Sequence, residues 1–551
     1  MSPTSSSVKT SPPPKDVRAL ARKAHAKTST HELIPPRSDI DTALLTLAIC
    51  AVSSYASQLS LSPVFGEIPS ALYHDQVKNT AFAAAASTAL ALKYTIPRSH
   101  ILLRLSRFLI PLIAVNIPLL QGAIWQSAKD LGAVNGPIVT EALTIGLLIG
   151  FTVFSIVGLV NPTVAPIRKA ATVDLILLAT SWLFFTYAEK GVVKYISPYV
   201  GSVWTTTRCG MEASVAVFAA SLHRSMFLAA ALPSFFPVFY MDSRCLMGSK
   251  GIQKLNQQLD PLNFTAIARI ESNTGYLSVL ENKAAHYRIL RCDHSILGGI
   301  WLKTVPGLEA YQDNPEHLRE PIYVVFVMLE AVRLIDPPAR EREDANALVI
   351  GLGIGTSASG LIQHGIKTHI VEIDPGVYKF AVDHFGLPAN HTVHIGDANY
   401  AGDLNLNASR AVIKTILSVF GACRAFREYP PEKDADLSKG DFTNMVIYCT
   451  PFHRPRWDPT NPYHANLRPE DIDAPYFRQV QEGDFLNTLV RRQGLVPQHE
   501  VDLRPIAATT SKQDIITTKT VDRLREWQRD SAILHWGIMN TVVPIDVWTL
   551  Y

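Results

Sequence analysis

The sequence predicts a two-part protein. An N-terminal bundle of apolar α-helices is followed by an α/β nucleotide-binding domain of the Rossmann type, preceded by a small antiparallel β-sheet. Three observations predict this fold. Charged residues are scarce between positions 41 and 240 and ordinary afterwards. A glycine-rich turn lies between two strand-like runs at 345–374, and a segment of alternating apolar and polar residues, 268–302, precedes it.

The composition agrees with this division. Of 551 residues, 47% are hydrophobic and only 18% charged, and the mean hydropathy is slightly positive, which is too apolar for a purely soluble protein. The net charge of +3 is close to balance and does not favour nucleic-acid binding. The six cysteines lack CxxC spacing. This argues against a metal site or a disulfide framework and suits a reducing compartment.

Residues 1–40 are rich in Ser, Pro and Lys and are expected to form a disordered basic tail. The segment has no apolar core of the kind found in signal peptides. A mitochondrial transit peptide is the alternative, but the early run of three prolines argues against a long amphipathic helix.

Residues 41–240 are expected to form a transmembrane domain of about six helices, because several segments approach the roughly 20 apolar residues that cross a bilayer. The segment 79–96 is Ala-rich, and the segment 211–236 is interrupted by His223-Arg224. For Arg224, a structural role or a misplaced span is favoured over a role in ligand binding. The six apolar segments are 41–61, 79–96, 108–125, 141–160, 171–188 and 211–236.

Basic residues give this domain an expected orientation. They precede the first segment and follow the second, fourth and sixth, although Lys190, Lys194 and Arg208 blur the contrast. By the positive-inside rule, the chain is expected to be a multi-pass protein of the lipid bilayer with its N-terminus and its C-terminal half, from about 245, both in the cytosol.

The strongest chemical signal is the glycine-rich turn. Strand ALVIG runs into Gly351, Gly353 and Gly355, then a helix, then strand THIVEID, which ends at Glu372. A third strand, HTVHIGDA, delivers Asp397. Glycines allow a tight turn and close approach of a ligand, and acids at the following strand ends reach ribose and base. The G-x-G-x-G spacing suits S-adenosylmethionine better than NAD.

The region before this turn, 245–340, is expected to be a substrate subdomain. It contains a β-meander with a hairpin turn at Asn273-Thr274-Gly275 and a buried helix at 320–335. The nucleotide domain then covers 341–551 and ends in an amphipathic helix at 521–544.

A small sheet, a helix and a glycine-rich nucleotide unit form the layout of the spermidine/spermine synthase (aminopropyltransferase) family. Over roughly 41–450 the sequence resembles membrane-embedded, fungal-type members of that family, most specifically in ESNTGYLSVLE, RCDHSILGG and VIGLGIGTSASGL. The resemblance implies a methyltransferase-like Rossmann domain. It also implies decarboxylated S-adenosylmethionine as co-substrate, no tightly bound cofactor, and aminopropyl transfer to a polyamine amine.

The resemblance also implies roles for individual residues. The three loop glycines would hold the tail of the donor, Glu372 its ribose and Asp397 its adenine, while Asp293 and Tyr323 would face the substrate. The chain departs from the family pattern at positions where polar groups would bind the cationic donor and substrate. These positions hold Ile354, Leu297, Val324 and Val325.

No catalytic residue is assigned, because the family's catalytic aspartate ends a fourth strand, and the comparison with the family predicts that this strand is missing between Ala398 and Asn399. A skipped exon is favoured over a genuine loss, since removing central strands would expose unpaired edges. In a third interpretation, VIYCT is the catalytic strand with Cys449 in the acid's place.

The sequence therefore predicts a membrane-anchored spermidine synthase-like protein whose catalysis is in doubt. The alternatives are an S-adenosylmethionine-dependent, methyltransferase-like enzyme on another substrate, and a non-catalytic membrane protein that retains the fold. The expected partners are the bilayer and a small-molecule amine, and a homodimer is left open.

Overall fold

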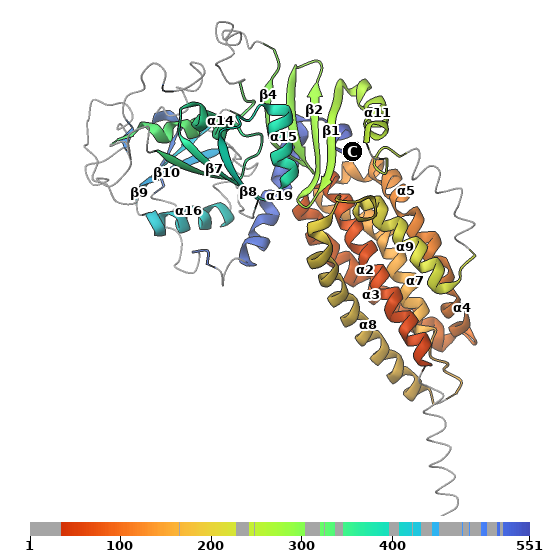
Figure 1. Ribbon diagram of the computed structural model, residues 1–551. Helices are drawn as coiled ribbons and strands as arrows, with labels where there is room; N and C mark the ends of the chain where they lie inside the picture. Colours follow the sequence, from red (N-terminus) through yellow and green to blue (C-terminus); the bar gives the residue numbers. More distant parts are fainter. Residues whose placement is uncertain are drawn as a thin grey trace, which may run out of the picture.

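The computed structural model describes most of the chain (Figure 1). The predicted tail up to residue 34, Asp397, and the junction between Ala398 and Asn399 lie outside the described residues. The described residues are 35–164, 166–226, 242–246, 248–303, 320–323, 325–336, 345–395, 407–420, 422–430, 444–450, 476–477, 484, 497–503, 515–517 and 522–551.

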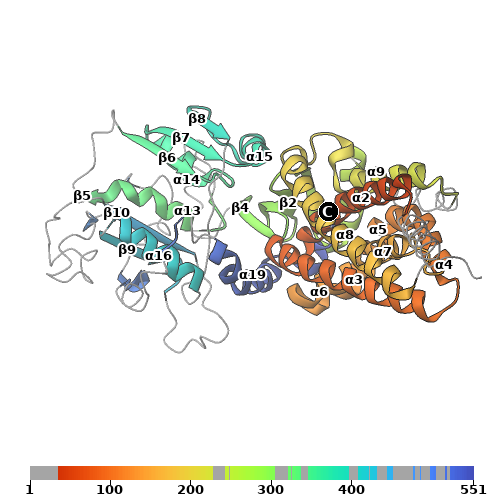
Figure 2. The same ribbon diagram turned by 90° about the horizontal axis from the view of Figure 1, so that it is seen from below.

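The N-terminal half is a bundle of long helices that lie side by side (Figures 1 and 2). Among the described residues, three stretches are long and apolar enough to cross a membrane, Arg37–Phe65, Ser99–Val157 and Ile167–Tyr199, where the sequence suggested six. The helices are α2 (Arg37–Phe65), α3 (Glu67–Thr95), α4 (Ser99–Leu105), α5 (Ile110–Ala128), α6 (Gly132–Leu143), α7 (Ile145–Val157), α8 (Ile167–Ile196) and α9 (Arg208–His223).

Small side chains allow helices of the bundle to pack closely. The Ala-rich segment is the second half of α3, where Ala85 and Ala89 are buried and allow close contact with α7. In α6, Gly136 lies against the ring of Phe65, where a Cβ would come within 2.2 Å. The other weak segment contains α9, which ends at His223 and is followed by Arg224 in the left-handed conformation, φ 48°.

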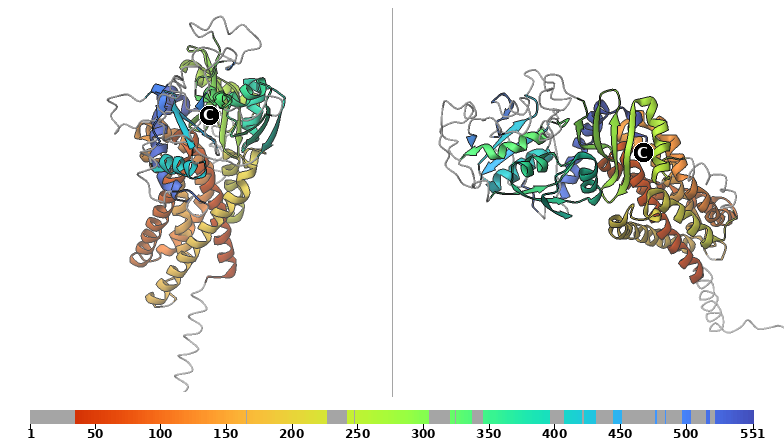
Figure 3. Two further views of the ribbon diagram at one scale, coloured as in Figure 1. Left: turned by 90° about the vertical axis from the view of Figure 1, so that its left-hand side faces the viewer. Right: turned by 45° about the horizontal axis from the view of Figure 1, so that its top comes forward.

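The bundle has a sheet end, which contacts the C-terminal half, and a far end. At the sheet end of α2, Val64 O accepts a hydrogen bond from Trp536 Nε1 (2.9 Å), and Ser60 O accepts one from the Tyr551 hydroxyl (2.6 Å). Arg37 begins the same helix at the far end, about 40 Å away at 1.5 Å per residue (Figure 3).

Arg37 and the C-terminal half therefore lie at opposite ends of the bundle, while the expectation that the N-terminus and the C-terminal half both lie in the cytosol stays a prediction. Helix α9 starts at the sheet end, where Arg208 approaches Asp293, and its last turn reaches the far end, where Ser225 donates to Phe108 O. At Arg244 the chain is again at the sheet end, because this guanidinium donates to Pro118 O and stacks on Trp125. The sequence pattern treated 211–236 as one crossing, whereas the described residues on either side of 227–241 lie at different ends of the bundle.

The predicted β-meander is confirmed. Its strands are β1 (Phe264–Ser272), β2 (Gly275–Asn282), β3 (Tyr287–Cys292) and β4 (Ser295–Trp301), antiparallel and in the order β1-β2-β3-β4. The hairpin lies at Asn273–Gly275 as expected, and α11 (Gly248–Leu259) packs on β1. The helix expected over 320–335 is shorter: α13 (Val325–Met328) continues into a 3-10 turn, η7 (Leu329–Leu334).

The glycine-rich region forms the expected strand–helix–strand unit. Strands β6 (Asn346–Ile350), β7 (Lys367–Glu372) and β8 (His391–Ile395) make a parallel sheet in the order β6-β7-β8, with α14 (Thr356–Gln363) and α15 (Pro375–Phe385) between them. The C-terminal half also contains a two-stranded sheet of β5 (Ile335–Asp336) and β11 (Tyr476–Phe477). A separate three-stranded sheet contains β9 (Ala422–Arg427), β10 (Met445–Thr450) and β12 (Glu500–Val501) in the order β10-β9-β12, and α16 (Asn407–Phe420) precedes β9.

Strand β6 lies at the edge of its sheet. Lys367 N donates to Ala345 O and Gly351 N donates to Val371 O, so odd-numbered residues of β6 bond to β7. The backbone groups of Leu348 and Ile350 face the opposite edge, where the described residues place no strand. Their side chains are 63% and 57% exposed. Among the described residues, this edge of β6 is therefore open.

The C-terminal residues join the two halves of the molecule. The predicted amphipathic helix is confirmed as α19 (Asp522–Val542), which is followed by the short α20 (Ile545–Trp548). Met539 and Trp548 pack into one apolar cluster with Leu280 and Ile289 of the small sheet. Helix α19 also contacts α3 and α6 of the bundle.

The expectation of unpaired cysteines is wrong for four of the six. Cys209 is bonded to Cys245, and Cys423 to Cys449. The second pair joins directly opposite positions of β9 and β10, a contact that sequence spacing does not reveal. The interpretation of Cys449 as a catalytic residue is also corrected, because its sulfur is bonded to another cysteine.

Candidate functional site

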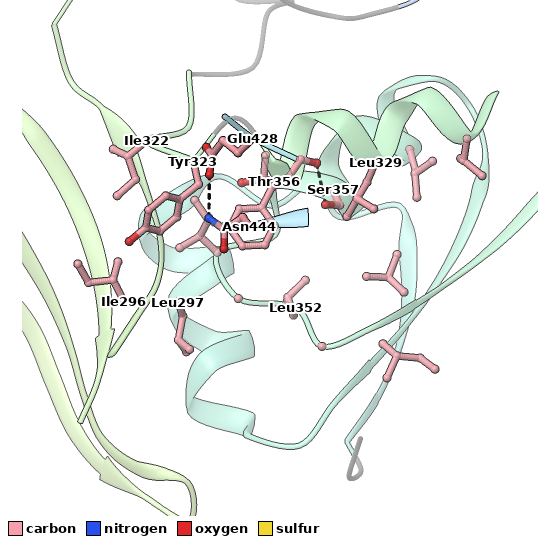
Figure 4. A pocket seen from close by; sticks show the side chains of 18 of the residues that line it. Ile296, Leu297, Ile322, Tyr323, Leu329, Leu352, Thr356, Ser357, Glu428 and Asn444 are labelled. Carbon is pink, nitrogen blue, oxygen red and sulfur yellow. Dashed lines mark hydrogen bonds between the residues drawn. The ribbon is translucent and has the colours of Figure 1, made fainter. Parts of the chain in front are cut away.

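A cavity of about 1610 Å3 lies between the small sheet and the parallel sheet (Figure 4). One wall is formed by β4 with Ile296 and Leu297, and the opposite wall by β6 and the turn Gly351–Ile354. η7 and α19 contribute further apolar side chains. The cavity therefore runs along the whole of β6 and includes the carboxyl end of this strand, where open α/β sheets bind their ligands.

The glycine-rich turn is held in place by Glu372. One carboxylate oxygen accepts from Leu352 N (2.7 Å) and the other from Asp374 N (3.0 Å). Gly353 has φ 55°, and a Cβ there would lie 2.6 Å from Leu297 O of β4. Only glycine therefore allows the turn to approach the small sheet this closely. Thr356 and Ser357, the first residues of α14, also line the cavity, so the N-terminus of this helix points toward it.

Polar side chains gather on another part of the wall. Glu428 follows β9 and Asn444 precedes β10, and Asn444 Nδ2 donates to Glu428 Oε2 (2.8 Å). The backbone of Glu428 also donates to Asn444 O (2.9 Å), so strand pairing fixes the position of the carboxylate. Tyr323 lies nearby on the same wall (Figure 4). The cavity thus has a glycine-rich side and a side with a carboxylate and a phenol.

Two titratable groups of the cavity have pKa values shifted by their surroundings. Burial, aided by the negative charge of Glu428, raises the pKa of Tyr323 to about 12. Burial also lowers the pKa of His535 on α19. At neutral pH, Tyr323 is therefore a hydroxyl donor and His535 is uncharged.

Comparison with known proteins identifies one relative that matches nearly the whole chain. An N-terminal histidine N-methyltransferase of Emericella nidulans is 33% identical over 592 aligned positions, which cover 96% of this chain and 99% of the relative. The chain belongs to the family of this methyltransferase. No protein-family model and no solved structure matches the chain.

Membership of the N-terminal histidine N-methyltransferase family corrects the sequence-based assignment. The spermidine/spermine synthase family, polyamine biosynthesis and decarboxylated S-adenosylmethionine as donor are all overturned by this relative. Ile354 supplies a physical reason, since it stands where aminopropyltransferases hold the donor's amine with an acid. Here its side chain is buried and lies against Gly298 of β4.

The structure brings together only some of the residues chosen from the sequence. Gly351, Gly353 and Tyr323 line the cavity. Gly355 and Glu372 are not among its lining residues and support the turn from behind. Asp397 lies outside the described residues.

Asp293 lies elsewhere, at the sheet end of the bundle. Its carboxylate accepts from Tyr276 N (2.8 Å) and pairs with the Arg208 guanidinium (3.3 Å). In this structure Asp293 therefore joins the small sheet to α9, and it is not a lining residue of the cavity.

Sequence reasoning missed Glu428, Asn444 and His535. The first two meet only because β9 and β10 pair, and His535 reaches the cavity only because α19 docks between the two sheets. A charged residue at the end of an apolar strand, as in ACRAFREY, was the available signal for Glu428. Among the described residues, no cluster of His, Cys, Asp or Glu could hold a metal ion.

The alignment bears on the predicted missing unit. Its 592 positions exceed the 551 residues of the chain, so the relative has residues with no counterpart here. A strand and helix inserted between β8 and α16 would be able to cover the open edge of β6.

The missing strand and helix between Ala398 and Asn399 remain a prediction, which two measurements test. Sequencing the transcript across the codons for Ala398 and Asn399 is expected to reveal a longer in-frame message. In amide hydrogen exchange, Leu348 and Ile350 are expected to exchange rapidly in the chain as written. They become protected when the relative's matching residues are inserted, but not when a Gly/Ser segment of equal length is inserted. Protection of both amides in the chain as written would show that one of its own segments already covers β6.

Proposed function

We propose that the chain transfers a methyl group from S-adenosylmethionine to a nitrogen of an N-terminal histidine in a polypeptide. The observation that carries this proposal is the similarity to the Emericella nidulans enzyme over 96% of the chain. The site supports it, because a glycine-rich turn and a carboxylate line one cavity. The whole of β6, including Leu348 and Ile350 at its open edge, lines the cavity, so part of the volume of about 1610 Å3 is the space that the predicted missing unit would fill.

The donor would lie on the glycine-rich side. S-adenosylmethionine carries a carboxylate that its decarboxylated form lacks, and the N-terminus of α14 behind Gly355 suits an anionic group. Gly351 and Gly353 would let the backbone approach the donor, and Glu372 would order the turn from behind. Asp397 would face the adenine.

The acceptor would lie against Tyr323 and Glu428. An N-terminal histidine carries an α-ammonium group, and a carboxylate that is 92% buried is a strong partner for such a cation. This places a polypeptide terminus in the cavity, in place of the small-molecule amine expected from the sequence.

The chemical step needs positioning more than acid–base assistance. The lone pair of an uncharged histidine nitrogen attacks the methyl carbon of the sulfonium, the carbon–sulfur bond breaks, and its electron pair returns to sulfur. The products are the N-methylated histidine and S-adenosylhomocysteine. The attacking ring nitrogen carries no hydrogen, so the proton that passes to water leaves the other ring nitrogen of the methylated imidazolium. The chain contributes by holding donor and acceptor in line across the cavity, with Tyr323 and Glu428 on the acceptor side.

Replacement of Glu428 by Gln tests the acceptor site. Loss of the charge is expected to raise KM for a peptide that begins with histidine by about tenfold or more, because a charge-assisted hydrogen bond contributes roughly 1.5–3 kcal/mol. The affinity for S-adenosylmethionine should stay unchanged. Glu281→Gln is the matched control, since Glu281 pairs with Arg288 outside the cavity. Equal KM values for E428Q and E281Q would contradict this role of Glu428.

The pH dependence provides a second test of the same contact. Tyr323 and His535 both stay uncharged between about pH 6.5 and 10, because burial raises the pKa of Tyr323 to about 12 and lowers the pKa of His535. The acceptor then sets the profile of kcat/KM. The rate rises as the substrate imidazole loses its proton near pH 6.5 and falls as the α-ammonium group loses its proton above about pH 8.

The E428Q variant is expected to lose only the falling limb of this profile, because it no longer distinguishes ammonium from amine. Steady-state kinetics from pH 5.5 to 9 measures both limbs. A falling limb of equal size in E428Q and in the unsubstituted protein would exclude Glu428 as the partner of the ammonium group.

Calorimetric titration tests the donor. The purified full chain is expected to bind S-adenosylmethionine at least about tenfold more tightly than the decarboxylated form, because the donor's carboxylate is recognised. Preference for the decarboxylated donor would restore aminopropyl transfer. Binding of neither would favour a non-catalytic protein that retains the fold.

The proposal includes a bundle that lies in a membrane. The outward face of α8 is apolar, with Leu175 59% and Ile176 57% exposed. From Ile167 to Tyr187 this helix rises about 30 Å, the thickness of the hydrocarbon core of a bilayer. The protein should therefore stay with membranes after alkaline carbonate washing, and its release by that treatment would contradict this placement.

A further inference from the structure

We propose that the C-terminal half of the chain lies on the non-cytosolic, oxidising side of its membrane, where Asn263 and Asn390 carry N-linked glycans. The inference rests on the proposed membrane embedding of the bundle and is independent of methyl transfer. It follows from the direction of the helices, the distribution of basic residues, the disulfides, and the positions of the acceptor sequences for glycosylation.

The direction of the helices separates the two ends of the protein. Arg37 opens α2 at the far end, and the same helix reaches the C-terminal half at Val64. A bundle that spans a bilayer therefore places residues before α2 on one side and the C-terminal half on the other.

Basic residues identify the far end as the cytosolic one. In the sequence, six Lys and Arg residues lie between positions 9 and 27, ahead of α2. Arg98 precedes α4, and Arg168 and Lys169 lie in the first turn of α8. At the sheet end, several basic side chains are instead neutralised by the C-terminal half, as Lys129 is by Asp546 and Arg208 by Asp293. By the positive-inside rule the far end faces the cytosol.

Both disulfides lie on the side that this orientation makes non-cytosolic. Cys209 lies in the first turn of α9, at the sheet end, and is bonded to Cys245. The pair Cys423–Cys449 joins β9 and β10 of the C-terminal half. Disulfides persist in the secretory compartments and are rare in the cytosol.

The acceptor sequences for N-linked glycans follow the same division. Asn263-Phe264-Thr265 and Asn390-His391-Thr392 match N-x-[ST], and both asparagines are exposed. A third match, Asn407-Ala408-Ser409, also lies in the C-terminal half. Before residue 245 the only N-x-[ST] sequence is Asn161-Pro162-Thr163, at the far end, where the proline prevents modification.

The two asparagines are accessible because both precede strands at exposed turns. Asn263 follows a 3-10 turn and enters β1, and Asn390 directly precedes β8. Neither residue lines the cavity, so glycans there would leave the proposed active site open.

The orientation is tested by protease treatment of sealed microsomes from eukaryotic cells that express the full chain. The C-terminal half is expected to be protected until detergent opens the vesicles, while the tail before α2 is cleaved. Cleavage of the C-terminal half in intact vesicles would overturn the orientation, whatever the result of a methylation assay.

The glycans are tested on the same material with an endoglycosidase and gel electrophoresis. Enzyme treatment should increase mobility, and N263Q and T392A should each remove one glycan step. T392S keeps the acceptor sequence and is expected to keep the glycan, so it controls for the substitution itself. N407Q shows whether the third acceptor sequence is used. A protected C-terminal half whose mobility is unchanged by the enzyme would overturn the glycan assignment while leaving the orientation intact.

Discussion

Replacing Arg291 with Met is expected to lower the free energy of unfolding by about 3 kcal/mol or more, because each buried carbonyl oxygen that loses its hydrogen-bond donor costs roughly 1–3 kcal/mol. Arg291 of β3 is 1% exposed. Its guanidinium donates to Pro63 O at the sheet end of α2 (2.9 Å) and to Trp548 O (2.8 Å) and Leu550 O (2.9 Å) near the C-terminus. It also stacks on Trp548, 4.9 Å from the ring centroid. One side chain thus joins the bundle, the small sheet and the last helix.

The measurement is thermal unfolding of the detergent-purified protein, followed by tryptophan fluorescence, with limited proteolysis of the segment after α19. Arg288→Met on the same strand is the control. Arg288 is partly exposed and pairs with Glu281, so its loss should cost only about 1 kcal/mol. Equal destabilisation by R291M and R288M would show that Arg291 does not join the three parts.

Replacing Gly353 with Ala is expected to weaken binding of S-adenosylmethionine by about tenfold or more. The added Cβ would meet Leu297 O at 2.6 Å and would also need φ near 55°, which costs an L-residue about 1–2 kcal/mol. The turn must then move away from β4, and the donor site widens. Isothermal titration with S-adenosylmethionine measures the effect.

Gly365→Ala separates backbone strain from the clash. Gly365 has φ 78°, no atom within 4 Å of an added Cβ, and a position outside the cavity. This variant should lose about 1–2 kcal/mol of stability and bind the donor normally. A folded G353A protein with unchanged donor affinity would contradict the assignment of the glycine-rich turn to the donor.

Local patterns were sufficient for much of the fold. The β-meander, its hairpin at Asn273–Gly275, the strand–helix–strand unit around the glycine-rich turn and the amphipathic helix α19 are all confirmed. Each depends on residues close in sequence, where alternation, helical period and turn chemistry decide the outcome.

Long-range contacts explain what the sequence could not predict. The disulfides, the approach of Glu428 to Asn444 and the pairing of Asp293 with Arg208 join segments that come together only in the folded chain. The path of the chain through the bundle was missed for a related reason: hydropathy finds apolar segments but does not show how many times the chain passes between the ends.

The residues themselves held a clue to the correct chemistry. Ile354 and Leu297 replace polar groups that would bind a cationic aminopropyl donor. In the structure the two apolar side chains come from facing elements and both line the cavity. This chemistry favoured the methyltransferase alternative, which the Emericella nidulans relative supports. The shared layout of sheet, helix and glycine-rich turn had favoured the aminopropyltransferases, and layout alone does not determine function.

The most direct test of the proposed activity is methyl transfer to defined peptides. The full chain is incubated with S-adenosylmethionine and three peptides that differ only at the N-terminus: a free histidine, an N-acetylated histidine and a free alanine. Mass spectrometry should find one added methyl group on the terminal histidine of the first peptide, much less on the acetylated peptide, and none on the alanine peptide. Equal methylation of the alanine peptide, or none of any peptide, would contradict the proposed function.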